Sequence, residues 1–415
     1  TTNMSLKITK VTLPDRQGNW HVAIANGYIT EISAAPILKA TAETLDAQGK
    51  LLIPGLVDPH IHLDKALLLD RYPAVEGTFS EALQKTLQAK QEYTQSDIQS
   101  RARRVIEKAI AFGTTSMRTH VEVDPIVQLK SMAALLPLKS EYAWGMTLQL
   151  AVFAQEGITN QPGTIDLLRK AMAMGGDAIG SAPYVDPEPE ENIRLVFDLA
   201  QEFDCDVDFH LDFLDDDAPL LLPVVIAETL KRNWQDRVCL GHMTKLAGLT
   251  PAELATFIPQ LKEAGIAILA LPATDLYMMA KQDTHNVRRG VAPINRLAES
   301  GVKVGLATNN VQNLFTPFGD GDVLKICTLL AQVLQLGTTA SHQLCLSMAT
   351  SRAAQAIGID NYGVEVGKAA DLVLIDADSV SVAIATAPLN RTIIKRGKIV
   401  AQSKLSIDFK EDLKS

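Results

Sequence analysis

The chain has 415 residues, of which 47% are apolar, so it can fill one large domain and an accessory one. A net charge of -9 without a basic stripe argues against nucleic acid or an anionic membrane surface as a partner. Four cysteines in apolar segments, with no Cys-x-x-Cys spacing, indicate reduced thiols, and the chain shows neither an export signal nor a membrane-spanning run. We therefore expect a cytoplasmic protein.

Short segments near both ends of the chain have the alternation of β-strands. They are residues 5–11, 21–25 and 28–33 near the start, and residues 370–375, 391–395 and 398–400 near the end. We expect the two ends to pair into one accessory β-sandwich domain formed by residues 1–54 and 361–415.

Between these ends, residues 55–360 alternate short apolar strand patterns with helical patterns. Examples of the predicted strands after the first are residues 115–123, 147–153, 206–211, 238–241, 267–271 and 302–307, and helical patterns cover residues 97–112 and 193–202. Roughly eight such units predict a (β/α)8 barrel of the TIM type, although a doubly wound open sheet gives similar local patterns.

The first strand of this central domain ends in His60 and His62. Because side chains alternate along a strand, both imidazoles project to the same side, where they can hold one divalent metal ion. The alternative is a pair of polar residues at a loop edge. Further polar residues fall at the C-terminal ends of later predicted strands, namely His120, His210, His242, Asn309 and Asn310. Barrel enzymes build their sites at that face, so the placement favours both the barrel and the metal site.

These motifs resemble those of the amidohydrolase superfamily over nearly the whole chain. The resemblance is carried by the segment from Pro54 to His62, by His210 and by the Gly241-His242 pair. Within the superfamily, the chain is most similar to the cytosine deaminase branch, which includes N-isopropylammelide isopropylaminohydrolase. The branch motifs are the segments 62–65, 118–124, 153–157, 288–290 and 317–320.

The resemblance implies a hydrolase that cleaves a C–N bond of a pyrimidine- or triazine-like heterocycle, by deamination or dealkylamination. It implies that His60, His62 and His210 hold one divalent ion, Zn²⁺ or Fe²⁺, which lowers the pKa of a bound water toward ~7. His242 would contact that water, and Gln155 would hydrogen-bond the edge of the heterocycle. The relatives also imply a homo-oligomer.

The sequence departs from the family pattern at two positions. Asn309 stands where the family has an aspartate that binds the metal and accepts a proton; a carboxamide offers one oxygen but carries no charge and takes no proton. Phe213 stands where cytosine deaminases have a glutamate that carries protons. Asp212, on the same strand face as His210, is our candidate to share proton transfer with His242; alternatively it orients a histidine or caps a loop.

Three other polar residues are candidates for substrate binding, each with an alternative. His120 would line the pocket by resemblance, or it is a buried histidine bonded to the backbone. Lys65 would hold an acidic substrate, or it forms a salt bridge with Asp64 or Glu122. Asn310 would present a further amide above the barrel.

Two other functions stay open at this stage. The loss of the carboxylate at position 309 is compatible with a silenced barrel that binds a heterocyclic ligand without hydrolysing it. The activated water of a metal site can also attack the carbonyl of an amide or lactam ring.

Overall fold

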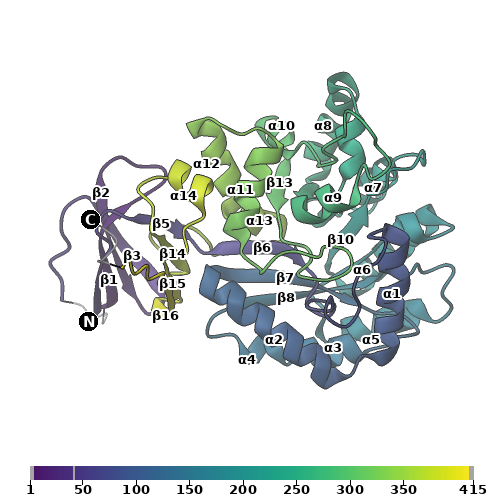
Figure 1. Ribbon diagram of the computed structural model, residues 1–415, viewed down its shortest axis with the longest axis horizontal. Coiled ribbons are helices and arrows are strands. Elements are labelled where there is room, and N and C mark those ends of the chain that lie inside the picture. Colours follow the sequence, from purple (N-terminus) through teal and green to yellow (C-terminus); the bar gives the residue numbers. More distant parts are fainter. Residues whose placement is uncertain (1–3, 41–42, 411–415) are drawn as a thin grey trace.

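Two eight-stranded sheets organise the chain, which we describe from a computed structural model over residues 4–40 and 43–410. One sheet forms a barrel ringed by helices, and the other stands beside it (Figure 1). None of the helices in this part of the chain is long and apolar enough to cross a membrane.

The barrel sheet consists of parallel strands in sequence order. They are β6 (Leu56–Ile61), β7 (Thr114–Glu122), β8 (Thr147–Ala154), β9 (Ala178–Ser181), β10 (Asp206–Leu211), β11 (Val238–His242), β12 (Ala267–Ala270) and β13 (Lys303–Leu306). The last strand returns to the first, because the Asn309 amide donates to the His60 carbonyl at 2.9 Å and the His62 amide donates to the Asn309 carbonyl at 2.9 Å. The predicted (β/α)8 barrel is confirmed.

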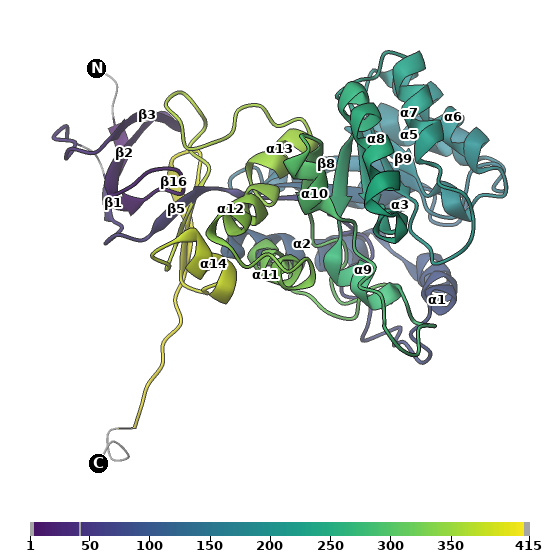
Figure 2. The same ribbon diagram turned by 90° about the horizontal axis from the view of Figure 1, so that it is seen from above.

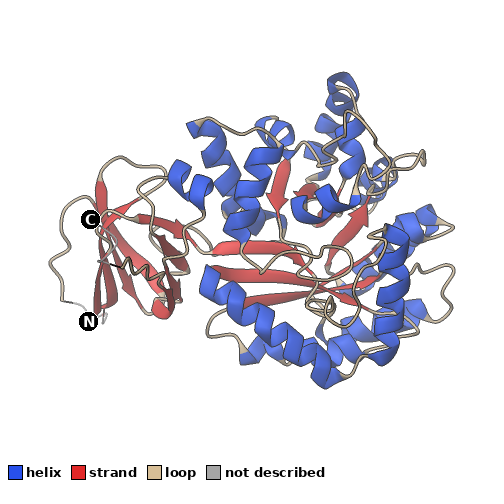
Figure 3. Ribbon diagram, viewed as in Figure 1, coloured by secondary structure: helices blue, strands red, loops and turns tan. Residues whose placement is uncertain are grey.

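Helices cover the outside of the barrel, as Figure 3 shows in blue around the red strands. They are α1 (Phe79–Glu92), α2 (Gln95–Phe112), α3 (Lys130–Leu135), α4 (Leu138–Glu141), α5 (Thr164–Gly175), α6 (Pro189–Phe203), α7 (Leu222–Lys231), α8 (Pro251–Ala264), α9 (Pro272–Met278), α10 (Ile294–Glu299), α11 (Val323–Val333), α12 (Thr339–Met348) and α13 (Ser351–Ala356), with 3₁₀ turns η1 (Pro183–Val185) and η2 (Thr244–Gly248).

Helix α2 shows how the sequence forms one of these covering helices. The Thr94 hydroxyl accepts a hydrogen bond from the Asp97 amide at its start, and Gly113 ends it with a φ of 102° that favours glycine. Its buried residues, among them Ile98, Val105 and Ile106, recur at helical spacing and face the core. On the other side, every residue of strands β6, β7 and β11 is buried, as expected for parallel strands between helices and a filled interior.

The accessory sheet joins the two ends of the described chain. Its strands are β1 (Met4–Thr12), β2 (Asn19–Ala25), β3 (Tyr28–Ser33), β4 (Glu43–Asp46), β5 (Leu51–Pro54), β14 (Leu372–Ile375), β15 (Arg391–Lys395) and β16 (Lys398–Ser403). Strand β14 pairs antiparallel with β5, and helix α14 (Val380–Thr386) follows β14. Figure 2 shows this sheet apart from the helices of the barrel. The two ends therefore pair as predicted, while the exact domain limits stay a prediction.

Candidate metal centre and active site

Five buried histidines converge inside the barrel, near the C-terminal ends of β6, β7, β10 and β11. The ring centroid of His60 lies 4.0 Å from that of His120, 4.6 Å from that of His210 and 6.0 Å from that of His242. The His62 and His210 rings are 5.2 Å apart. The structure thus brings together all the histidines that the sequence placed at strand ends.

Several ring nitrogens in this cluster are left without partners among the described residues. Both nitrogens of His60 and Nδ1 of His62 and of His210 have no hydrogen-bond partner within residues 4–40 and 43–410. The Nε2 atoms of His62 and His210 face each other at 3.2 Å. Burial and neighbouring positive groups hold the pKa of His60, His62 and His210 well below the usual range, so these imidazoles are neutral. Because unpartnered buried nitrogens are costly, the cluster fits a divalent cation.

The side-chain oxygen of Asn309 lies beside this histidine cluster. The Nδ2 of Asn309 donates to the Thr274 hydroxyl at 2.9 Å, while Oδ1 is buried and has no hydrogen-bond partner in the described part of the chain. The side chain also lies beside His60. Its geometry suits a neutral oxygen ligand, although it brings no charge.

His242 is held by a carboxylate, Asp275, that no sequence motif singles out. Its Nδ1 lies 2.7 Å from Oδ1 of Asp275, and the other Asp275 oxygen accepts from the Leu271 amide at 3.1 Å. Burial raises the pKa of Asp275. Because this bond occupies Nδ1, the Nε2 side of His242 is left for the pocket. The only signal in the sequence was one carboxylate in the apolar segment from Leu271 to Met278.

Asp212 is turned toward the backbone of the following loop. Its two carboxylate oxygens accept hydrogen bonds from the Leu221 amide at 2.8 Å and the Leu222 amide at 3.0 Å, at the start of α7. Burial raises its pKa to about 6, although these two bonds oppose the rise. Asp212 does not contribute to the wall of the pocket around His242. This geometry favours the capping alternative over a share in proton transfer.

An Asp212→Ala substitution is therefore expected to lower the free energy of unfolding by about 1–3 kcal/mol, because two backbone donors lose their acceptor. Urea denaturation measures this change. The opposite outcome, unchanged stability with a large loss of turnover, would restore Asp212 to the proton-transfer role.

The pocket above the histidines has aromatic and polar walls. Its aromatic side chains are Phe79, Tyr184, Phe213 and Phe315, and its polar ones include Gln155, Lys65, Thr274 and Asn310. The Phe213 ring lies 4.0 Å from the His242 ring, so an apolar group covers His242 where cytosine deaminases have a glutamate.

The candidate substrate contacts divide into two groups. Gln155 and Asn310 line the pocket, and the Asn310 oxygen accepts from Asn313 at 2.9 Å. Lys65 also lines it, but its Nζ lies 2.8 Å from Oε1 of Glu122, so the salt bridge is formed. His120 is absent from the wall and lies deeper, against His60.

Gly241 makes room for His60. A methyl group added at Gly241 would lie 2.8 Å from both Nδ1 and Cε1 of the His60 ring. We expect Gly241→Ala to displace this ring, to cost about 1–3 kcal/mol of stability and to weaken Zn²⁺ binding. Thermal denaturation and chelator competition measure the two effects. Gly248→Ala is the matched control, because nothing lies within 4 Å of its added methyl group. Equal stability and equal Zn²⁺ affinity of the two variants would show that Gly241 is not needed to make room for His60.

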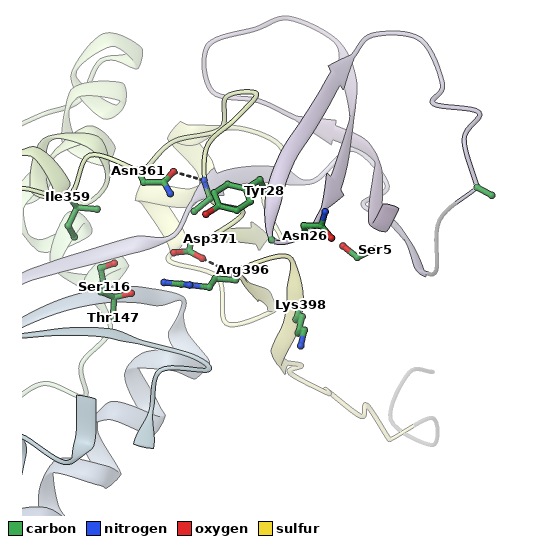
Figure 4. A pocket seen from close by; sticks show the side chains of 13 residues that line it. Ser5, Asn26, Tyr28, Ser116, Thr147, Ile359, Asn361, Asp371, Arg396 and Lys398 are labelled. Atoms are coloured by element: carbon green, nitrogen blue, oxygen red, sulfur yellow. Dashed lines mark hydrogen bonds between the residues drawn. The ribbon is translucent and has the colours of Figure 1, made fainter. Parts of the chain in front are cut away.

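A second cavity, of about 880 Å³, lies between the accessory sheet and the base of the barrel (Figure 4). Arg396, Asp371 and Asn361 line it beside Ser116 and Thr147, which lie near the N-terminal ends of β7 and β8. None of the clustered histidines borders it. Its size therefore does not make it the candidate site, since the unpartnered imidazoles lie at the other end of the strands.

Comparisons with known proteins agree with this geometry. The profile of the amidohydrolase family matches residues 51–401. The N-isopropylammelide isopropyl amidohydrolase of Pseudomonas sp. (strain ADP) is 29% identical over 98% of this chain and 99% of its own length. The crystal structure of 5-methylcytosine deaminase from Klebsiella pneumoniae with 5-fluorocytosine superposes with a TM-score of 0.92 at 30% identity, covering 98% of this chain and all of that one. That of N-isopropylammelide isopropylaminohydrolase from Burkholderia multivorans has a TM-score of 0.83 at 25% identity, covering 96% of this chain and 98% of its own.

Proposed function

The chain belongs to the amidohydrolase family and is a hydrolase acting on C–N bonds other than peptide bonds, and from this premise we propose its reaction and site. The proposed reaction is hydrolysis of an exocyclic C–N bond of a pyrimidine- or triazine-like ring, releasing ammonia or an alkylamine. Two relatives support this substrate class, since one is named for N-isopropylammelide and the other for 5-methylcytosine. The comparisons give no support to a silenced barrel.

The observation that carries the proposal is the set of neutral, unpartnered imidazoles at the floor of the pocket. His60, His62 and His210 are the proposed ligands of one divalent ion, Zn²⁺ or Fe²⁺, with the Asn309 oxygen beside them. When bound, such an ion would polarise water and lower its pKa toward ~7.

The remaining chemistry falls to side chains of the pocket. We propose that His242 accepts a proton from the attacking water and then donates that proton to the leaving nitrogen. Asn309 cannot do this, because a carboxamide takes no proton. Asp275 fixes the tautomer of His242 and stabilises its protonated form. Phe213 shields this imidazole, and the amides of Gln155 and Asn310 are placed to pair with donors and acceptors on the ring.

Elemental analysis of untagged protein, combined with a screen of aminopyrimidines and alkylaminotriazines for released ammonia or amine, tests this proposal. We expect about one Zn or Fe per chain, loss of turnover on chelation and recovery on adding the ion back. Protein that stays metal-free after incubation with Zn²⁺ and Fe²⁺ would contradict it. A homo-oligomer and a cytoplasmic location stay predictions.

A further inference from the structure

A second group of metal-compatible side chains lies directly under the proposed site. His60, His120 and Asp208 each offer one ligand atom, and these atoms lie within 4.8 Å of one another. All three side chains are completely buried. They come from β6, β7 and β10, and Asp208 precedes His210 by two residues, so both point into the barrel.

The atoms that converge here have no protein partners. Both ring nitrogens of His120 and Oδ1 of Asp208 lack a hydrogen bond to any residue that the structure describes. The other Asp208 oxygen accepts from Nη1 of Arg118 at 3.0 Å, which fixes the carboxylate and leaves Oδ1 free, 3.7 Å from Nε2 of His120. Arg118 already balances the charge of this carboxylate, but Oδ1 and the imidazole nitrogens still lack partners, and such buried polar atoms are costly unless a ligand such as a metal ion completes them.

Asp64 also has one oxygen without a partner, but two other buried carboxylates, Asp58 and Asp275, have no such oxygen. Asp275 uses its oxygens on His242 and the Leu271 amide, and Asp58 uses both of its oxygens on Thr308. Asp208 therefore differs from them in having an oxygen still available for a metal ion.

We propose that the divalent ion has a second position, between His60, His120 and Asp208, that it exchanges between this position and the first, and that it favours the second because Asn309 brings no charge to the first. The inference rests on the metal dependence in the proposed function. Two imidazoles and one carboxylate are a donor set that holds catalytic zinc and non-haem iron in proteins. Because both positions use His60, they exclude each other, and the chain binds one ion.

The two positions predict opposite rankings for the effects of two matched substitutions: the second makes the loss at His120 the larger, and the first makes the loss at His62 the larger. His62 and His120 each have their ring centroid 5.4 Å from that of Phe153, so phenylalanine replaces either ring in a similar aromatic setting. We expect His120→Phe to weaken Zn²⁺ binding about 10-fold in chelator competition, and His62→Phe to weaken it less. Absorption spectra of the Co²⁺-loaded proteins give a second readout, and the d–d bands should change in His120→Phe.

A double variant separates this inference from a general loss of structure. In an Asn309→Asp background, the first position regains its carboxylate, so His120→Phe should then change the Zn²⁺ affinity by less than about 2-fold. Asp208→Asn, which keeps an oxygen for Arg118, repeats the test if His120→Phe does not fold.

Each outcome bears on a different claim. Equal Zn²⁺ affinity of His120→Phe and the wild type, with a large loss in His62→Phe, overturns the second position and leaves the proposed function standing. A wild-type protein that binds none of Zn²⁺, Fe²⁺ and Co²⁺ overturns both.

Discussion

An Asp275→Asn substitution is expected to lower kcat about 10³- to 10⁴-fold while the protein keeps its fold and its metal. The Asp275 carboxylate accepts from Nδ1 of His242 at 2.7 Å and from the Leu271 amide at 3.1 Å. An asparagine keeps the volume but offers only one acceptor oxygen. It therefore no longer stabilises a protonated His242, and it favours the wrong tautomer when its amide group faces Nδ1.

Steady-state kinetics with any substrate found in the amine-release screen measures this loss. Asp283→Asn is a suitable control, because Asp283 pairs with Arg288 in a loop and does not line the pocket. Metal content should be equal in the wild type and both variants. A full kcat in Asp275→Asn would remove His242 and Asp275 from proton transfer.

Replacing Asn309 by aspartate is expected to raise the affinity for Zn²⁺ by about 10- to 100-fold, the range by which residues around metal sites typically change affinity. The side-chain oxygen of Asn309 already lies free among the histidines, so the substitution adds a negative charge without moving the side chain. The Thr274 hydroxyl, which now accepts from Asn309, can turn to donate to the new carboxylate.

Asn310→Asp is the matched control for this prediction. Asn310 also donates to Thr274, at 3.2 Å, but its oxygen already accepts from Asn313, so a carboxylate there adds charge without adding a free ligand. Chelator competition with Zn²⁺ gives the two affinities. If the Zn²⁺ affinity of both variants rises equally, the rise comes from the added negative charge alone, and Oδ1 of Asn309 does not face the ion.

Several features of the molecule could be predicted from the sequence alone. The alternation of apolar strands and amphipathic helices predicted the barrel, and the pattern over residues 97–112 corresponds to α2 at Gln95–Phe112. The spacing of His60 and His62 predicted that their rings lie together, and their centroids are 5.2 Å apart, although β6 ends at Ile61. These predictions succeed because they depend on side-chain periodicity within a single element, which neighbouring residues specify.

Other features were decided only by the packing of distant elements. Lys90 lies on a helix, where a lysine usually faces solvent, yet its ammonium group is completely buried and contacts Glu122, Asp124 and Glu156 from two other segments of the chain. The bond between His242 and Asp275 joins residues 33 positions apart.

The contacts of Asp212 could not be predicted from the sequence either, although its partners are only nine and ten residues away along the chain. Strand alternation predicted that Asp212 shares the face of His210, but β10 ends at Leu211, Asp212 has a φ of 46°, and its hydrogen bonds depend on where the loop before α7 returns. The sequence by itself thus determined the barrel and the histidines that enter it. The partners of each polar side chain were decided by the tertiary structure, because hydrogen bonds and ion pairs between elements depend on distances that no local pattern specifies.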